Sequence, residues 1–193
     1  MKKILVAYAT NSGTTADVAR RIGEQLQKHG HQVDVFLLEE IPSLEAYEAV
    51  LLGAPMIVGW HRAARAFLKQ HQARLAQIPV ALFVTCMSLT QTNTAQVDGV
   101  PVSVDPDLPK PPARQGRLSF KERYATVENY LRPVLKVAPQ VRPISVAFFG
   151  GRLDLYRLKW WQSLFVLLII QAQLGDKRNW PAIEAWADSL AEL

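Results

Sequence analysis

The stretch that decides the fold of this chain is residues 3–22, KILVAYATNSGTTADVARRI. Residues 3–8 are an apolar run, which is typical of a strand buried on both faces of a parallel sheet. Residues 14–29 place apolar side chains at four-residue steps opposite charged ones, and a glycine at position 30 ends the pattern. The stepped apolar residues are Val18, Ile22 and Leu26. A polar loop therefore joins a buried strand to an amphipathic helix.

The loop itself has the composition of an anion site. Residues 9–15 are small or carry hydroxyl or amide groups, and none of them is charged. We expect the loop at the carboxyl edge of the sheet, where doubly wound folds bind ligands and where backbone N–H groups at a helix start favour an anion. The side chains that would complete the shell are those of Thr10, Asn11, Ser12, Thr14 and Thr15. An alternative is that Thr14 only caps the helix, with Asp17 completing a capping box.

The spacing of the loop limits which anion it would hold. It fits neither the G-x-G-x-x-G pattern of dinucleotide folds nor the G-x-x-x-x-G-K-[ST] pattern of P-loop enzymes. The loop has no lysine for a triphosphate and no second glycine for a pyrophosphate. A single phosphate monoester is therefore the predicted ligand.

The rest of the chain alternates strands and helices, apart from one stretch. Strands are predicted over residues 32–37, 49–54, 79–85 and 141–149, helices over 62–75, 119–132 and 179–193, and a short turn or helix around 42–47. This alternation predicts one α/β domain, residues 1–193, with a doubly wound parallel sheet and helices on both faces. Residues 90–118 hold five of the twelve prolines and show little periodicity, so they are predicted to be an insertion loop without regular structure.

Charge and cysteine content narrow the functional classes. The net charge of +5 favours an anionic partner, and nucleic acid is disfavoured because no stacking platform or recognition helix is evident. The single cysteine, Cys86, excludes an intramolecular disulfide, and no apolar signal segment follows Met1, so a cytoplasmic location is expected. The histidines have no metal-ligand spacing, so no metal site is predicted.

The strand at residues 4–8, ILVAY, followed by TNSGTT at residues 10–15, resembles the flavodoxin phosphate loop, T-x-[TS]-G-[NT]-T. The resemblance implies a five-stranded sheet in the order 2-1-3-4-5 and an FMN cofactor whose phosphate lies in the loop, Gly13 included, without a basic side chain. It also implies that the loops after the third and fourth strands flank the isoalloxazine ring. The ring contacts it implies are Pro55, Met56, Gly59, Trp60, Thr85, Cys86, Met87, Ser88 and Leu89.

Three of these positions have distinct expected roles. Trp60 has a flat face suited to stack on the flavin, and its alternative is a partly buried packing residue. Gly59 would permit a peptide rearrangement near the flavin N5. For Cys86, a small core residue is favoured over a redox thiol.

The C-terminal third resembles a narrower branch of this family. The segment FGGRLDLYRLKWW at residues 149–161, the apolar run at 164–170 and a closing helix with Trp180, Ile183 and Trp186 are similar to the flavodoxin-type, menaquinone-dependent protoporphyrinogen oxidases. That similarity implies an enzyme of heme biosynthesis that oxidises a porphyrinogen-like substrate and reduces menaquinone or another quinone. Candidate groups for pairing substrate carboxylates or polarising the flavin edge are His61, Arg62 and Arg152, each of which has an ordinary surface role as its alternative.

Residues 164–170, LFVLLII, are too short to cross a bilayer. With Trp160 and Trp161 before them, they suit contact with the inner face of the cell membrane. The alternatives are a helix buried against the sheet and a helix in the interface of a homo-oligomer. Two further functions stay open: a soluble flavodoxin-like electron carrier or quinone reductase with another substrate, and a non-catalytic binding domain that has lost the flavin.

Overall fold

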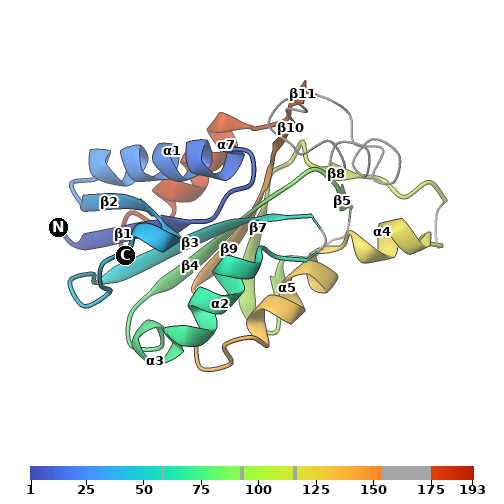
Figure 1. Cartoon of the computed structure of the whole chain (residues 1–193). Coiled ribbons are helices and arrows are strands. Elements are labelled where there is room, and N and C mark those ends of the chain that lie inside the picture. Colours follow the sequence, from blue (N-terminus) through green and yellow to red (C-terminus); the bar gives the residue numbers. More distant parts are fainter. Residues whose placement is uncertain (58, 92–93, 115–116, 154–174) are drawn as a thin grey trace.

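A central sheet organises the computed structural model, which describes residues 1–57, 59–91, 94–114, 117–153 and 175–193 (Figure 1). The sheet has seven strands in the order β2-β1-β3-β4-β9-β7-β6. Their bounds are β1 Lys3–Tyr8, β2 Gln32–Leu37, β3 Ala49–Met56, β4 Val80–Cys86, β6 Gln96–Val97, β7 Val100–Val104 and β9 Ser145–Gly150. Neighbouring strands are parallel except for β6 and β7, which are antiparallel.

The predicted fold class is confirmed. The strands expected near residues 3–8, 32–37, 49–54, 79–85 and 141–149 are β1, β2, β3, β4 and β9, and they lie in the predicted order 2-1-3-4-5. The parallel pairs between them place successive strands in one direction, so their carboxyl ends share one edge.

The sheet is wider than five strands, because the prediction that residues 90–118 lack regular structure was wrong. Strand β7 pairs in parallel with β9, and β6 pairs with β7 as a hairpin. Asp98 and Gly99 both have positive φ, 50° and 82°, as tight two-residue hairpin turns require. A second short pair, β5 (Leu89–Thr90) with β8 (Pro109–Lys110), also involves this region.

Helices cover both faces of the sheet (Figure 1). Helices α1 (Thr14–Lys28) and α7 (Trp180–Asp188) lie side by side on one face, and α2 (Arg62–Gln70), α3 (Gln72–Leu75) and α5 (Val127–Leu135) lie on the other. The remaining helices are α4 (Phe120–Tyr124) and the 3-10 helix η1 (Leu38–Glu40). The helices predicted over 62–75 and 119–132 are each divided in two, at His71 and at Ala125 and Thr126. The turn expected around 42–47 is present at residues 45–46, where Tyr47 N donates to Leu44 O at 3.2 Å, and η1 precedes it.

The core has two layers because alternate residues of each strand point to opposite faces. In β4, Leu82 and Val84 join the cluster beneath α2 and α5, whereas Ala81 and Phe83 join the cluster beneath α1 and α7. Burial on both faces explains the continuous apolar runs of the central strands. Every helix in the described part of the chain falls short of the length and apolar character that a membrane crossing requires.

Candidate functional site

The loops that follow β1, β3, β4 and β9 meet at the carboxyl edge of the sheet. Two backbone hydrogen bonds tie a loop to the neighbouring strand: Ala9 N, after β1, donates to Gly53 O of β3 at 2.9 Å, and Gly151 N, after β9, donates to Cys86 O at the end of β4 at 3.1 Å. The loop after β9 continues into β10 (Arg152–Leu153), which pairs antiparallel with β11 (Gly175–Asp176). Residues from four separate parts of the sequence are therefore neighbours at this edge.

The loop after β1 leaves the N-terminus of α1 without a side-chain cap. Gly13 is the N-cap residue, has φ 86° and supplies no side-chain cap, while its own N–H donates to Thr10 Oγ1 at 2.9 Å. Within the described residues, no backbone carbonyl accepts from the N–H groups of Thr14, Thr15 or Ala16. These first-turn donors are left to water or to a ligand. The loop therefore presents several convergent N–H groups at the positive end of the helix dipole.

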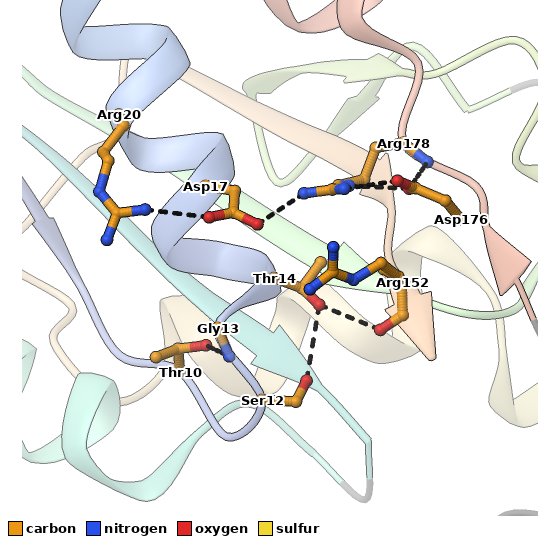
Figure 2. A network of polar contacts seen from close by, with 9 residues as sticks. All are labelled: Thr10, Ser12, Gly13, Thr14, Asp17, Arg20, Arg152, Asp176 and Arg178. Carbon is orange, nitrogen blue, oxygen red and sulfur yellow. Dashed lines mark hydrogen bonds and ion pairs between the residues drawn. The ribbon is translucent and has the colours of Figure 1, made fainter. Parts of the chain in front are cut away.

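The capping alternative for Thr14 was wrong, because Thr14 is the first residue of α1 rather than its cap. Its Oγ1 donates to Arg152 O at 3.0 Å and lies 3.5 Å from Ser12 Oγ (Figure 2). Asp17 completes no capping box. Its carboxylate accepts from Arg20 at 2.9 Å and from Arg178 at 2.7 Å.

The predicted hydroxyl shell divides into two groups. Thr10 and Ser12 are partly exposed and Asn11 is exposed, so these three side chains can reach a ligand. Thr15 and Thr85 are buried and bond to each other, with their Oγ1 atoms 2.8 Å apart. Thr15 therefore contributes its backbone N–H to the loop, while its hydroxyl joins α1 to the end of β4.

The loop after β3 is a tight reverse turn. Met56 and Trp60 form an antiparallel bridge, Ile57 N donates to Gly59 O at 3.3 Å, and Gly59 has φ 89°, a backbone conformation that favours glycine. His61 N then donates to Pro55 O at 3.2 Å. The turn leaves the side chain of Ile57 41% exposed near its tip.

Trp60 is a packing residue rather than an open stacking surface. Its side chain is 4% exposed, belongs to the core cluster beneath α2, and donates from Nε1 to Ala54 O at 3.2 Å. The indole ring faces inward because the β3 turn folds back on itself and delivers position 60 to the core. Among the described residues of this loop, Ile57 has the exposed apolar side chain, and the stacking prediction did not consider it.

His61 and Arg62 lie where α2 begins. His61 is the N-cap of α2, with its Nδ1 accepting from Ala63 N at 3.3 Å, and burial lowers the pKa of its imidazole. A neutral imidazole fits this capping role, since Nδ1 must accept a hydrogen bond. Arg62 is exposed at the first helical position. Of the side chains of His61 and Arg62, that of Arg62 therefore carries the positive charge at neutral pH.

The loop after β4 has a buried and an accessible part. Cys86 and Leu89 are buried, Met87 is partly exposed, and Ser88 is exposed. Burial raises the pKa of the Cys86 thiol to about 12, so the thiol is protonated at neutral pH and unsuited to a redox role. Met87 and Ser88 are the members of this loop that can face a ligand.

The sequence reasoning missed one neighbour of the site, Gly151, and named another, Arg152, without locating it. Gly151 packs closely on the other loops, since a Cβ at this position would lie 3.2 Å from Met87 Sδ and 3.9 Å from Thr14 Cγ2. Arg152 lies beside the helix start, where its carbonyl accepts from Thr14. The glycine pair at the end of the fifth strand, Gly150 and Gly151, was the available signal, because consecutive glycines permit close approach of backbones.

The segment that returns from residue 175 is fastened to α1 by ion pairs (Figure 2). Arg178 donates from Nη1 to Asp17 at 2.7 Å and from Nε and Nη2 to the Asp176 carboxylate. These hydrogen bonds from Arg178 hold the pKa of Asp176 below its usual value. The predicted membrane contact, Trp160, Trp161 and residues 164–170, lies outside the described residues.

The flavodoxin domain family matches residues 5–179, and the chain therefore belongs to that family. Its similarity to a particular enzyme extends over almost the full length. Protoporphyrinogen IX dehydrogenase (quinone) of Escherichia coli strain K12 is 25% identical over 202 aligned positions, which cover 99% of this chain and 96% of that protein.

Solved structures agree on the fold. A short-chain flavodoxin associated with a PDU bacterial microcompartment superposes with a TM-score of 0.53 at 9% identity, over 100% of this chain and 98% of that one. A flavodoxin from the domain Archaea superposes with a TM-score of 0.50 at 11% identity, over 98% of this chain and 96% of that one. At these identities the likeness concerns the fold alone.

Proposed function

We propose that this protein is an FMN-dependent oxidoreductase that takes electrons from a porphyrinogen-like substrate and passes them to a quinone. The observation that carries the proposal is the open, uncapped start of α1 in a hydroxyl-bearing loop at the same sheet edge as the accessible parts of the β3 and β4 loops. The full-length similarity to a protoporphyrinogen IX dehydrogenase (quinone) supports the choice of substrates.

FMN is the cofactor, and the residues present fit it. Its phosphate suits the N–H groups of Thr14, Thr15 and Ala16, which no backbone carbonyl uses within the described residues, with Ser12 and Thr10 beside them. The loop has no side chain of its own closing the helix start, because Gly13 lacks one. A monoester phosphate therefore meets donors without displacing an internal cap.

Bound FMN would supply two-electron redox chemistry through its isoalloxazine ring. The chain's own contribution is to bind and orient that ring. Ile57 and Met87, one from each flanking loop, offer accessible apolar surface that would cover the ring and exclude water. Gly59, with its positive φ, would let the peptide of the turn reorient beside the ring. The buried Cys86 stays protonated and takes no part.

The substrate side of the proposal depends on charge. Porphyrinogens carry carboxylates, and Arg62 is an exposed cation directly after the turn that holds Ile57 and Gly59. His61 caps α2 with a lowered pKa, so it supplies a neutral polar group rather than a second cation. We therefore assign the pairing of a substrate carboxylate to Arg62.

The quinone partner motivates the membrane part of the proposal. Menaquinone is held in the bilayer, and the sequence places Trp160 and Trp161 ahead of the apolar run at 164–170. We propose that this segment contacts the inner face of the cell membrane. Co-sedimentation with anionic liposomes tests it: the parent protein should bind, and Trp160→Ala with Trp161→Ala should reduce the bound fraction. A parent protein that stays in the supernatant would contradict the proposal.

The activity is tested by anaerobic turnover of the FMN-loaded protein with protoporphyrinogen and a menaquinone analogue, followed by porphyrin fluorescence. We expect a rate that depends on FMN, protein and quinone together.

Ser12→Asp places a carboxylate at the proposed phosphate position and should abolish FMN binding by like-charge repulsion. Ser43→Asp adds the same charge at an exposed serine outside the loop and should leave binding unchanged.

The outcomes separate the alternatives. Bound FMN without porphyrinogen turnover would point to an electron carrier or a quinone reductase with another substrate. A parent protein that takes up no FMN would leave only the non-catalytic binding domain.

A further inference from the structure

Arg152 lies beside the helix start that the proposed FMN phosphate would occupy. Its carbonyl accepts from Thr14 Oγ1 at 3.0 Å, which fixes its backbone against the first residue of α1. Figure 2 shows its side chain extending from β10 in the direction of Thr14. A cation from the loop after the fifth strand is thereby brought to the loop after the first.

The guanidinium of Arg152 has no partner within the described ranges. Its Nε is buried and makes no hydrogen bond, and no ion pair or hydrogen bond joins its other nitrogens to the described residues. A buried polar group without a partner is costly, and more so when it is charged. Arg74 also has a buried Nε without a hydrogen bond, but its Nη2 donates to Tyr47 O at 2.9 Å.

The described carboxylates near Arg152 already accept hydrogen bonds from other arginines. Asp176, its partner in the β10–β11 register, accepts several hydrogen bonds from Arg178. Asp17, one turn into α1, accepts from Arg178 and from Arg20. The ion pairs of Figure 2 offset the charges of both acids. The charge of Arg152 also helps to lower the pKa of Asp176, but within the described residues its guanidinium forms no ion pair, so its donors can meet a ligand.

We propose that Arg152 binds the phosphate of the flavin cofactor and makes this site select phosphorylated flavin over riboflavin. A phosphate monoester carries a charge between about −1.5 and −2 near neutral pH, which the N–H groups of α1 offset only in part. A guanidinium adds a full positive charge and a planar fork of donors that matches phosphate oxygens. This role replaces the expected one, in which Arg152 paired with a substrate carboxylate.

The inference depends on the proposed function, and ligand affinity rather than turnover tests it. The dissociation constants of FMN and riboflavin are measured by calorimetry on the cofactor-free full-length protein. Arg152→Gln should weaken FMN binding by at least about tenfold, the loss expected for one charge-assisted contact, and leave riboflavin binding within about twofold. Arg152→Lys, which keeps the charge but loses the fork, should fall between the parent and Arg152→Gln.

The matched control is Arg142→Gln. Arg142 is exposed and precedes β9, so it lies at the opposite edge of the sheet, and its loss should change neither constant. Unchanged FMN affinity in Arg152→Gln, or equal weakening of FMN and riboflavin, would overturn the role of Arg152 alone. If Arg152→Gln does not fold by circular dichroism, an unchanged FMN-to-riboflavin ratio in Arg152→Lys overturns it instead. A parent protein that binds no FMN overturns the cofactor assignment as well.

Discussion

Arg178 and Asp17 are joined by a hydrogen-bonded ion pair of 2.7 Å in which the arginine side chain is only 7% exposed. The same guanidinium donates to Asp176 and lies 4.6 Å from the centre of the Trp180 ring. One side chain thus connects α1, β11 and the start of α7. It holds the two ends of the proposed phosphate site, the first turn of α1 and the β10–β11 pair, in a fixed relation.

The first prediction concerns this connection. Arg178→Met should lower the free energy of unfolding by about 1–3 kcal/mol, because it removes the nearly buried guanidinium that bridges two carboxylates and leaves each with fewer hydrogen-bond donors. Urea denaturation followed by circular dichroism measures the change. Arg20→Met is the control: its side chain is 61% exposed and pairs with the same Asp17, so its loss should cost less than about 1 kcal/mol. Equal effects of the two substitutions would contradict the prediction.

Acid should weaken the same connection. Hydrogen bonds from Arg178 lower the pKa of the Asp176 carboxyl, so this group stabilises the folded protein above its unfolded pKa of about 3.9. That contribution is lost as the pH falls through the lower folded value. We expect the melting temperature of the parent protein to drop as the pH falls below about 4, and to drop less in Arg178→Met. Thermal unfolding across this range tests the difference, and parallel curves would count against it.

Elements that depend on contacts between residues near in sequence can be predicted from the sequence, and elements that depend on distant residues cannot. β1 and α1 are predictable because an apolar run and a four-residue period are local signals. The β6–β7 hairpin is not, because β7 gains its place by pairing with β9, far along the chain. Val100, Val102 and Val104 do alternate with Pro101 and Ser103, but the prolines around them suggest a loop.

The site is predictable to the level of loops and not of side-chain directions. Parallel strands bring their carboxyl ends to one edge, so the approach of the β1, β3 and β4 loops follows from topology. The direction of the Trp60 side chain depends on the bridge between Met56 and Trp60. The Thr15 hydroxyl points into the protein because it forms a hydrogen bond with Thr85. Both side-chain directions depend on tertiary contacts, which a local sequence pattern does not reveal.

The buried pair of Thr15 and Thr85 gives a further prediction. Thr85→Val removes one hydroxyl and leaves the other buried without a partner, which should cost about 1–3 kcal/mol of stability. Replacing both by Val removes both polar groups, so the double variant should cost less than the sum of the single variants. The free energies come from urea titrations of the four proteins. Strictly additive losses would show that the two hydroxyls do not act as a pair.

The last prediction separates packing from flavin contact in the β3 loop. Trp60→Phe removes the hydrogen bond to Ala54 O, so it should lower stability by about 1–2 kcal/mol while FMN affinity stays within about twofold. Ile57→Ala should do the reverse, because its exposed side chain contributes little to the core but is proposed to cover the ring. Stability is measured with urea on the FMN-free protein, and FMN affinity by calorimetric titration of the same protein. Iodide quenching of flavin fluorescence in the loaded protein reports how far the bound ring is exposed. If Trp60→Phe raises flavin fluorescence and spares stability, Trp60 stacks on the ring after all, and the inward-facing indole is not its position in the loaded enzyme.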